Sequence, residues 1–110
     1  MKIAIPTANG QLAMHFGHCD KFAVVNVENN EISNKEELTP PTHEPGVLPK
    51  WLGDLNVNII IAGGMGQRAQ QLFAANNIKV LVGAPAESVE NLVTAYIKGT
   101  LVNGSNVCDH

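Results

Sequence analysis

The feature that most constrains the fold is an apolar run at residues 57–62, VNIIIA, which leads into the glycine-rich sequence GGMG at residues 63–66. A strand this rich in β-branched residues has almost no polar face, so both of its faces must be covered. Such strands are typical of the centre of an α/β sheet, where helices pack on either side. We therefore expect an α/β fold with residues 57–62 as a central strand.

The rest of the chain supplies the other elements of such a sheet. Short apolar runs bounded by polar or turn-forming residues predict four further strands, over residues 3–5, 22–27, 31–38 and 79–82. Apolar residues at helical spacing predict three helices, over about residues 46–56, 69–76 and 87–99. Because Asn29 and Asn30 tolerate the left-handed backbone of a tight hairpin, the second and third strands should be antiparallel. The order predicts a mixed five-stranded sheet, its second strand antiparallel, with three helices on its faces.

The length and composition of the chain indicate one globular domain. It has 110 residues, about the size that one hydrophobic core serves. Hydrophobic residues make up 45% and charged residues 15%, a balance that argues against an intrinsically disordered chain. We expect residues 1–100 to form a single α/β domain and residues 101–110 to form a C-terminal tail.

Charge and hydropathy argue against several classes of protein. The net charge of −3 and the scattered positions of the seven basic residues disfavour binding to nucleic acid. No apolar stretch approaches the roughly 18 residues that a membrane span requires, and the apolar start is too short for a signal peptide. Two cysteines far apart in the sequence do not make the dense framework of a small secreted protein. We therefore expect a cytoplasmic protein with reduced thiols.

The predicted topology collects the possible ligands on one edge of the sheet. If every strand except residues 22–27 runs the same way, the loops that follow these strands open on one edge, the usual ligand side of an α/β fold. Those loops span residues 7–19, 40–45, 63–67 and 83–85. They contain every histidine except His110, and the first of the two cysteines.

The densest group of possible metal ligands is the sequence HFGHC at residues 15–19. His15, His18 and Cys19 place two imidazoles and a thiol within five residues, beside a glycine that lets the backbone bend. This combination can bind soft or borderline metals. The alternative is that the two histidines are solvated loop residues and that Cys19 is a small core residue.

Three further residues are weaker candidates for metal ligands. His43 lies in a proline-rich loop, where a solvent-exposed histidine without a ligand role is the commoner case. Cys108 and His110 lie at the end of the chain, and ten extended residues reach roughly 33 Å, so the tail could return to the loops. An idle, frayed terminus is about as common.

The glycine-rich turn after the central strand is a candidate anion site. Gly63, Gly64 and Gly66 leave the peptide groups bare, so that helix N–H donors and the positive end of the helix dipole could face an anion. The turn is neither a P-loop nor a dinucleotide fingerprint, and close packing of strand and helix is an equally good explanation of it. Arg68 could add a guanidinium to the site, although a solvated arginine is commoner.

Taken together, the HFGHC loop, the sequence PKWL at residues 49–52, the sequence IAGGMG at residues 61–66 and the Cys-x-His end resemble the dinitrogenase iron-molybdenum cofactor biosynthesis family. The resemblance covers almost the whole chain. This family includes NifX-like nitrogenase cofactor carriers and the molybdenum-copper orange proteins. The resemblance implies a ribonuclease H-like fold with a mixed five-stranded sheet, in agreement with the order of elements above.

The resemblance also implies a function, which is transient binding of an anionic metal–sulfur cluster for delivery to another protein. The cluster would be of the iron-molybdenum, iron-sulfur or molybdenum-copper sulfide type. The implied partners are cluster assembly or acceptor proteins, among them an assembly ATPase, and the chain is expected to be a monomer or a weak dimer. The histidine-bearing loop of the family matches residues 15–19, its middle loop matches residues 39–45, and its strand-to-helix turn matches residues 63–66. Some relatives have more histidines in the middle loop, where this chain has only His43.

We expect a carrier or scaffold and not an enzyme. A metal-dependent nuclease of the same fold would need acidic residues on its central strands, and residues 2–6 and 57–62 contain none. A zinc hydrolase that uses His15 and His18 would lack a well-placed carboxylate base. Two alternatives are a metal-independent protein-interaction module of the same fold and a small zinc-binding protein.

Overall fold

The computed structural model of the protein describes residues 1–13, 20–41 and 46–101. The strands are β1 (Lys2–Ala8), β2 (Gln11–Leu12), β3 (Lys21–Glu28), β4 (Glu31–Leu38), β5 (Ile59–Ile61) and β6 (Lys79–Leu81). The helices are α1 (Val47–Asp54), α2 (Gln67–Ala75) and α3 (Val89–Lys98). Every predicted strand and helix is present, most of them within two residues of the predicted limits.

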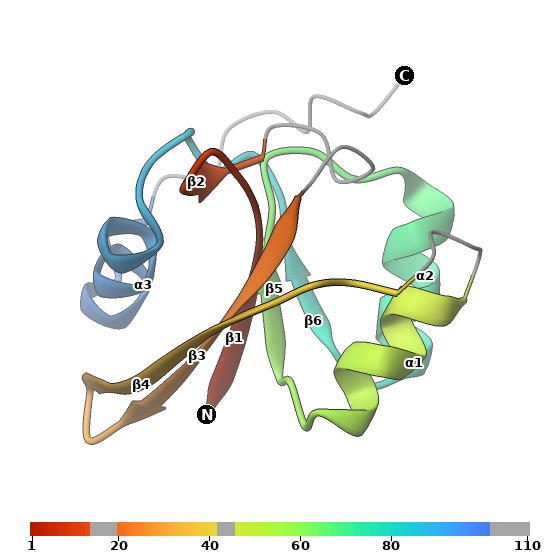
Figure 1. The fold of residues 1–110 in the computed structure, drawn as a ribbon, viewed down its shortest axis with the longest axis horizontal. Helices are drawn as coiled ribbons and strands as arrows, with labels where there is room; N and C mark the ends of the chain where they lie inside the picture. Colours follow the sequence, from red (N-terminus) through yellow and green to blue (C-terminus); the bar gives the residue numbers. More distant parts are fainter. Residues whose placement is uncertain (14–19, 42–45, 102–110) are drawn as a thin grey trace.

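The strands form one mixed sheet in the order β4-β3-β1-β5-β6, with β2 paired to β1 (Figure 1). β3 is antiparallel to both of its neighbours, whereas β1, β5 and β6 are parallel to one another. β1, β4, β5 and β6 therefore run in the same direction, and β3 runs against them. This confirms the predicted mixed sheet in which the second of five main strands is reversed.

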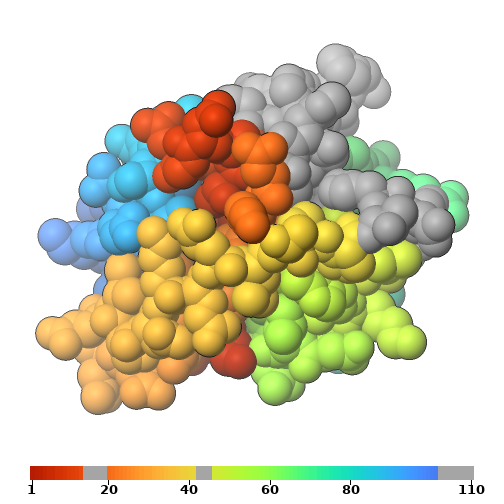
Figure 2. Space-filling model, viewed as in Figure 1, coloured from red at the N-terminus to blue at the C-terminus, as the bar shows by residue number. Residues whose placement is uncertain are grey.

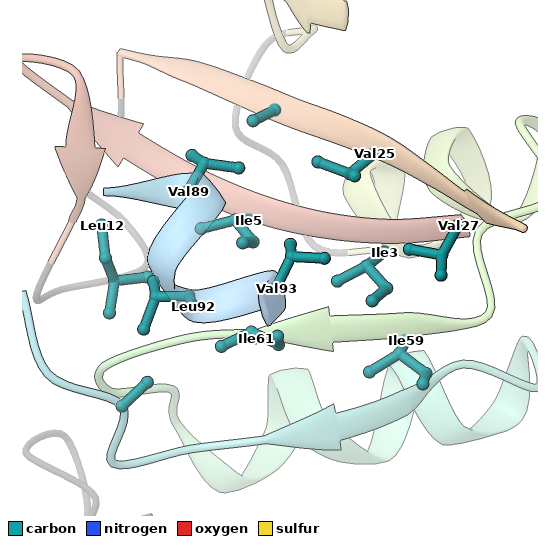
Figure 3. Close-up of a cluster of buried hydrophobic side chains, with 12 residues drawn as sticks. Ile3, Ile5, Leu12, Val25, Val27, Ile59, Ile61, Val89, Leu92 and Val93 are labelled. Carbon is teal, nitrogen blue, oxygen red and sulfur yellow. The ribbon is translucent and has the colours of Figure 1, made fainter. Parts of the chain in front are cut away.

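Helices cover both faces of this sheet (Figure 1). α3 lies on one face, and α1 and α2 lie together on the other. The buried side chains of the strands alternate between the two sides: Ile3 and Ile5 join the cluster around α3, while Ala4 joins the cluster around α1 and α2. Figure 3 shows the α3 side, where Leu92 and Val93 pack over these isoleucines. Burial on both faces explains why the central strands are apolar throughout.

β1 continues through Pro6, where the sequence suggested that the strand would stop. The last residue pair between β1 and β5 is Ala4 with Ile60. The Lys2 carbonyl accepts a hydrogen bond from the Asn58 N–H on the β5 side of β1, so the even-numbered peptide groups face that side. Pro6 lies beyond the last such pair, so its missing N–H removes no bond from the sheet.

A short sixth strand, β2, lies within the segment that we predicted to be a loop over residues 7–19. β1 and β2 form a tight hairpin in which Ala8 pairs with Gln11. Its two turn residues have positive φ angles, 56° at Asn9 and 81° at Gly10. An Asn-Gly pair favours this turn because both residues tolerate a left-handed backbone, so the signal was present in the sequence.

The hairpin of β3 and β4 turns at Asn29 and Asn30, as predicted, with φ angles of 53° and 62°. A bulge interrupts its register, because Ile32 pairs with Val27 whereas Asn34 pairs with Asn26. The extra residue in β4 moves the side chain of Ile32 to the α3 side of the sheet. Almost all of β4 is exposed, which agrees with its polar sequence.

The helix ends follow local sequence signals to different degrees. α3 begins after Ser88, whose side chain accepts a hydrogen bond from the Asn91 N–H at 3.2 Å, and ends at Gly99 with φ 73°. α1 and α2 begin after Gly46 and Gly66, and neither has a side-chain cap. None of the helices in the described part of the chain is long and apolar enough to cross a membrane.

Candidate functional site

The loops that follow β1, β4, β5 and β6 all leave the sheet at one edge, which we call the carboxyl edge. The shared direction of these four strands places their ends there. The register supports this, because Pro6 of β1 and Leu38 of β4 both pair with Phe22 of β3. The strand directions therefore confirm that these four loops begin at one edge of the sheet.

All six predicted metal ligands lie outside the described residues; they are His15, His18, Cys19, His43, Cys108 and His110. Their predicted roles stay predictions. Among the residues that the structure does describe, no group of three or more His, Cys, Asp or Glu side chains could hold a metal ion.

The described residues on either side of segment 14–19 are nevertheless fixed at the carboxyl edge. On one side, the Ala13 N–H donates to the Pro6 carbonyl oxygen, with an N–O distance of 2.9 Å. On the other side, the Asp20 N–H donates to the Thr7 carbonyl oxygen at 2.7 Å. Both ends of the segment are therefore tied to adjacent residues near the end of β1.

The glycine-rich turn divides into a buried part and an exposed part. Gly63 and Gly64 are buried, and the Gly63 carbonyl accepts a hydrogen bond at 3.0 Å from the N–H of Gly83, in the loop after β6. This bond joins two neighbouring loops, which favours a packing role for the first glycine. Gly66 is exposed and faces open space, since a Cβ atom there would meet nothing within 4 Å.

The N-terminus of α2 has the properties of an anion site. Gly66 provides no side-chain cap, and the first turn contains no acidic residue. Arg68 lies in that first turn, is exposed, and forms no ion pair within the described residues. The first N–H groups of a helix lack intrahelical partners and carry partial positive charge, so an uncapped end favours an anion.

The N-terminus of α1 shares several of these features, although Pro49 in its first turn has no N–H to donate, and the sequence analysis missed it. Gly46 precedes this helix in the left-handed conformation, without a side-chain cap and with no acid in the first turn. Lys50 is exposed near this end. The available signal was the lack of Ser, Thr, Asp or Asn directly before Val47. By contrast, α3 has both the Ser88 cap and an acidic residue in its first turn, and it lies on the other face of the sheet.

An open groove of about 530 Å³ lies beside the start of α1. Its lining residues are Pro41, Gly46, Val47, Lys50, Trp51 and Asp54. The Trp51 ring is half-buried and packs edge-on against Phe22, with ring centroids 5.7 Å apart. Figure 2 shows this side of the molecule, with α1 beside the hairpin of β3 and β4. An apolar groove with a Lys and an Asp at its rim can accept a segment of another protein.

The described residues thus bring two uncapped helix ends and two basic side chains to the carboxyl edge. Gly66 and Arg68 lie at the start of α2, Gly63 and Gly64 are buried in the turn before it, and Lys50 lies near the start of α1. Positive charge and helix-terminal N–H groups that have no partner within the helix favour an anionic ligand.

Comparisons with known proteins agree with this architecture. The family model described as "Dinitrogenase iron-molybdenum cofactor" matches residues 1–99. An uncharacterized protein of Methanocaldococcus jannaschii, MJ0580, is 36% identical over 106 residues, which cover 92% of this chain and 89% of the relative. The crystal structure of PH0822 is 29% identical, with a TM-score of 0.86 and 94% of each chain covered. The apo form of the orange protein from Desulfovibrio gigas shares the fold, with a TM-score of 0.76, 21% identity, and 96% of this chain and 93% of that chain covered.

Proposed function

The chain belongs to the dinitrogenase iron-molybdenum cofactor family, and from this premise we propose that it binds an anionic metal–sulfur cluster at the carboxyl edge and carries it for another protein. The observation that supports this most strongly is the pair of uncapped helix ends, at Gly46 and Gly66, on the same side of the sheet. Each end has a basic residue close by, Lys50 and Arg68. This arrangement attracts an anion without enclosing it.

In this proposal the metal ligands come from the segment that begins after Ala13 and ends before Asp20. Cys19 is the first candidate, because a thiolate is the best protein ligand for soft metals and for sulfide clusters. His15 and His18 would complete the set in the same segment. The hydrogen bonds of Ala13 and Asp20 to β1 would keep these ligands close to the helix ends.

His43, Cys108 and His110 would be additional ligands in the same proposal. His43 belongs to the segment between Pro41 and Gly46, two residues that line the groove beside α1. The cargo would be an iron-molybdenum, iron-sulfur or molybdenum-copper sulfide cluster, and the partner a cluster assembly or acceptor protein. A site on an open edge suits a carrier, because a carrier has to release its cargo.

Elemental analysis and visible absorption of protein purified without oxygen and without a metal-affinity tag would test this proposal. The same protein should then be treated with sulfide and with iron, molybdate or copper. We expect stoichiometric metal and charge-transfer absorption bands, both lost in Cys19→Ser. Cys108→Ser removes the other thiol and should lose less metal than Cys19→Ser, because Cys108 is only an additional ligand in this proposal.

Two results would contradict the proposal. A colourless protein that takes up none of these metals would exclude cluster carriage. Binding of zinc alone, at one equivalent and without charge-transfer bands, would point to the small zinc-binding protein instead.

The groove beside α1 favours a second candidate, a metal-independent interaction module. Trp51 lines this groove and offers an apolar surface to a partner segment. In that case partner binding would survive both metal removal and Cys19→Ser, and Trp51→Ala would abolish it.

A further inference from the structure

β6 is an edge strand whose outer side has no partner strand within the described residues. It is the last strand of the sheet and pairs only with β5 (Figure 1). The Lys79 N–H donates to the Asn58 carbonyl oxygen at 3.0 Å, and the Leu81 carbonyl accepts from the Ala62 N–H at 2.8 Å. Peptide groups alternate along a strand, so Val80 directs its N–H and C=O to the open side, and Val82 follows it.

The side chains of this strand are incompletely buried. Val80 and Val82 pack partly against the cluster around α1 and α2, whereas Leu81 packs partly against the cluster around α3. All three are half-buried. A free edge with three consecutive aliphatic side chains favours the addition of another strand.

The opposite edge strand of the sheet, β4, carries charged side chains that protect it against pairing with another chain, whereas β6 has little such protection. Seven of the eight residues of β4 are exposed, and four of them are charged: Glu31, Lys35, Glu36 and Glu37. Charged side chains on an edge strand oppose pairing with another chain. On β6 only Lys79 is charged.

We propose that β6 pairs antiparallel with β6 of a second copy of this chain, which joins the two sheets across a two-fold axis at Leu81. In this register Val80 lies opposite Val82 of the second copy. Each of these two residues donates its N–H to the carbonyl oxygen of the other. The two-fold axis repeats both hydrogen bonds between Val82 and Val80 of the second copy.

The side chains and charges support a second copy as the occupant. Opposed residues of an antiparallel pair share a face of the sheet, so the two valines meet on the α2 side and the two Leu81 side chains meet on the α3 side. Lys79 lies opposite Gly83, so no two like charges face each other. The strand can therefore pair with itself so that aliphatic side chains meet on both faces and no like charges are opposed.

This pairing predicts a weak dimer. A strand pair of this length buries less than the roughly 1,200 Å² at the lower end of stable interfaces, so we expect self-association only at about 0.1–1 mM. Because the strands are antiparallel, the two carboxyl edges point to opposite ends of the joined sheet. Each copy keeps its own site, and the inference does not depend on what that site binds.

Sedimentation equilibrium and amide hydrogen exchange on the full chain would test the dimer. The average mass should rise above 11.7 kDa as the concentration increases. In the same range, exchange of the Val80 and Val82 amides should slow at least several-fold, while that of Leu81, which faces β5, should not change. A monomer at every concentration, or a dimer in which the two valine amides exchange as before, would overturn the proposal.

A substitution at the two-fold axis gives an independent test. Leu81→Lys places two ammonium groups side by side and should weaken dimerisation at least tenfold. Ile32→Lys, which adds the same charge to the β4 edge, should leave dimerisation unchanged. Far-UV circular dichroism would establish that both variants are folded, and equal dimerisation of folded Leu81→Lys would refute the proposed edge.

Discussion

At the scale of single residues, asparagine sets many of the turns of this fold. Every described non-glycine residue with a positive φ angle is an asparagine: Asn9, Asn29, Asn30, Asn56 and Asn77. These residues lie at the tips of the two hairpins and directly after α1 and α2. Asparagine tolerates the left-handed region better than other side chains, so these residues act as readable stop signals in the sequence.

A single ion pair connects β4 with α3 and makes stability depend on pH. Lys35 Nζ lies 2.8 Å from Glu90 Oε2, in the first turn of α3. The hydrogen bond from Lys35 lowers the pKa of Glu90 below its ordinary value of 4.5, with help from a backbone hydrogen bond. A lowered carboxyl pKa stabilises the fold above the ordinary value, and this contribution is lost as the pH falls through the lowered one.

We therefore expect Glu90→Gln to reduce the free energy of unfolding at neutral pH by roughly 0.2–1 kcal/mol, the range for exposed ion pairs. The difference from wild type should shrink on acidification and vanish once the carboxyl group is protonated in both the folded and unfolded states. Urea unfolding over a series of pH values measures this. Glu36→Gln is the control, because Glu36 lies on the same hairpin and forms no ion pair with any described residue. A pH-independent loss of stability in Glu90→Gln would contradict the assignment.

At the scale of elements, the uncapped start of α2 links stability with binding. Gly66 has φ −63° and ψ 153°, an extended conformation that any residue can adopt, and there is open space for a side chain. Serine at this position would accept a hydrogen bond from the first turn. That oxygen would occupy the N–H donors which we propose for the anion.

Gly66→Ser should accordingly raise the free energy of unfolding by a few tenths of a kcal/mol, about the usual difference between serine and glycine caps. It should also weaken binding of a thiometallate such as tetrathiomolybdate, measured by calorimetry. Gly66→Ala adds a side chain without an acceptor and should bind the anion like wild type. Unchanged binding by a stabilised Gly66→Ser would show that these N–H groups do not contact the anion.

The elements also show which parts of the fold could be predicted from sequence. The run at residues 57–62 and the Asn29-Asn30 turn were enough to predict a mixed sheet with a reversed second strand, because both signals are local. The bulge in β4 was not predictable, because it is a shift of strand register and no local residue pattern marks it. The sequence suggested that β1 ends at Pro6, because proline has no N–H to donate to a neighbouring strand. Only the sheet register shows that no such hydrogen bond is needed at this position.

Strand direction alone was enough to predict that four loops begin at one edge of the sheet. The chemistry of that edge was less predictable. The uncapped start of α1 and the role of Lys50 depend on two helices lying on the same face, which local patterns do not reveal. Whether the six predicted metal ligands meet is likewise a property of tertiary structure.

At the scale of the whole molecule, the central sheet couples two separate hydrophobic clusters. β1 contributes Ile3 and Ile5 to one cluster and Ala4 to the other, and β5 divides its residues in the same way. Neither helical layer can lose its packing without exposing one face of these strands. The two sides should therefore unfold together.

The only tryptophan in the chain makes this coupling measurable. Trp51 reports on the α1 side through its contact with Phe22, whereas Leu92 is fully buried on the α3 side.

Leu92→Ala should lower the free energy of unfolding by about 2–5 kcal/mol, the usual range for a buried leucine. It should shift the urea midpoint of Trp51 fluorescence by as much as that of far-UV circular dichroism. Thr94→Ala, at an exposed position of the same helix, should shift neither by a comparable amount. If Trp51 kept its wild-type midpoint in Leu92→Ala while circular dichroism changed, the two faces would be independent units, and the sheet would not be the single cooperative core inferred from its alternating side chains.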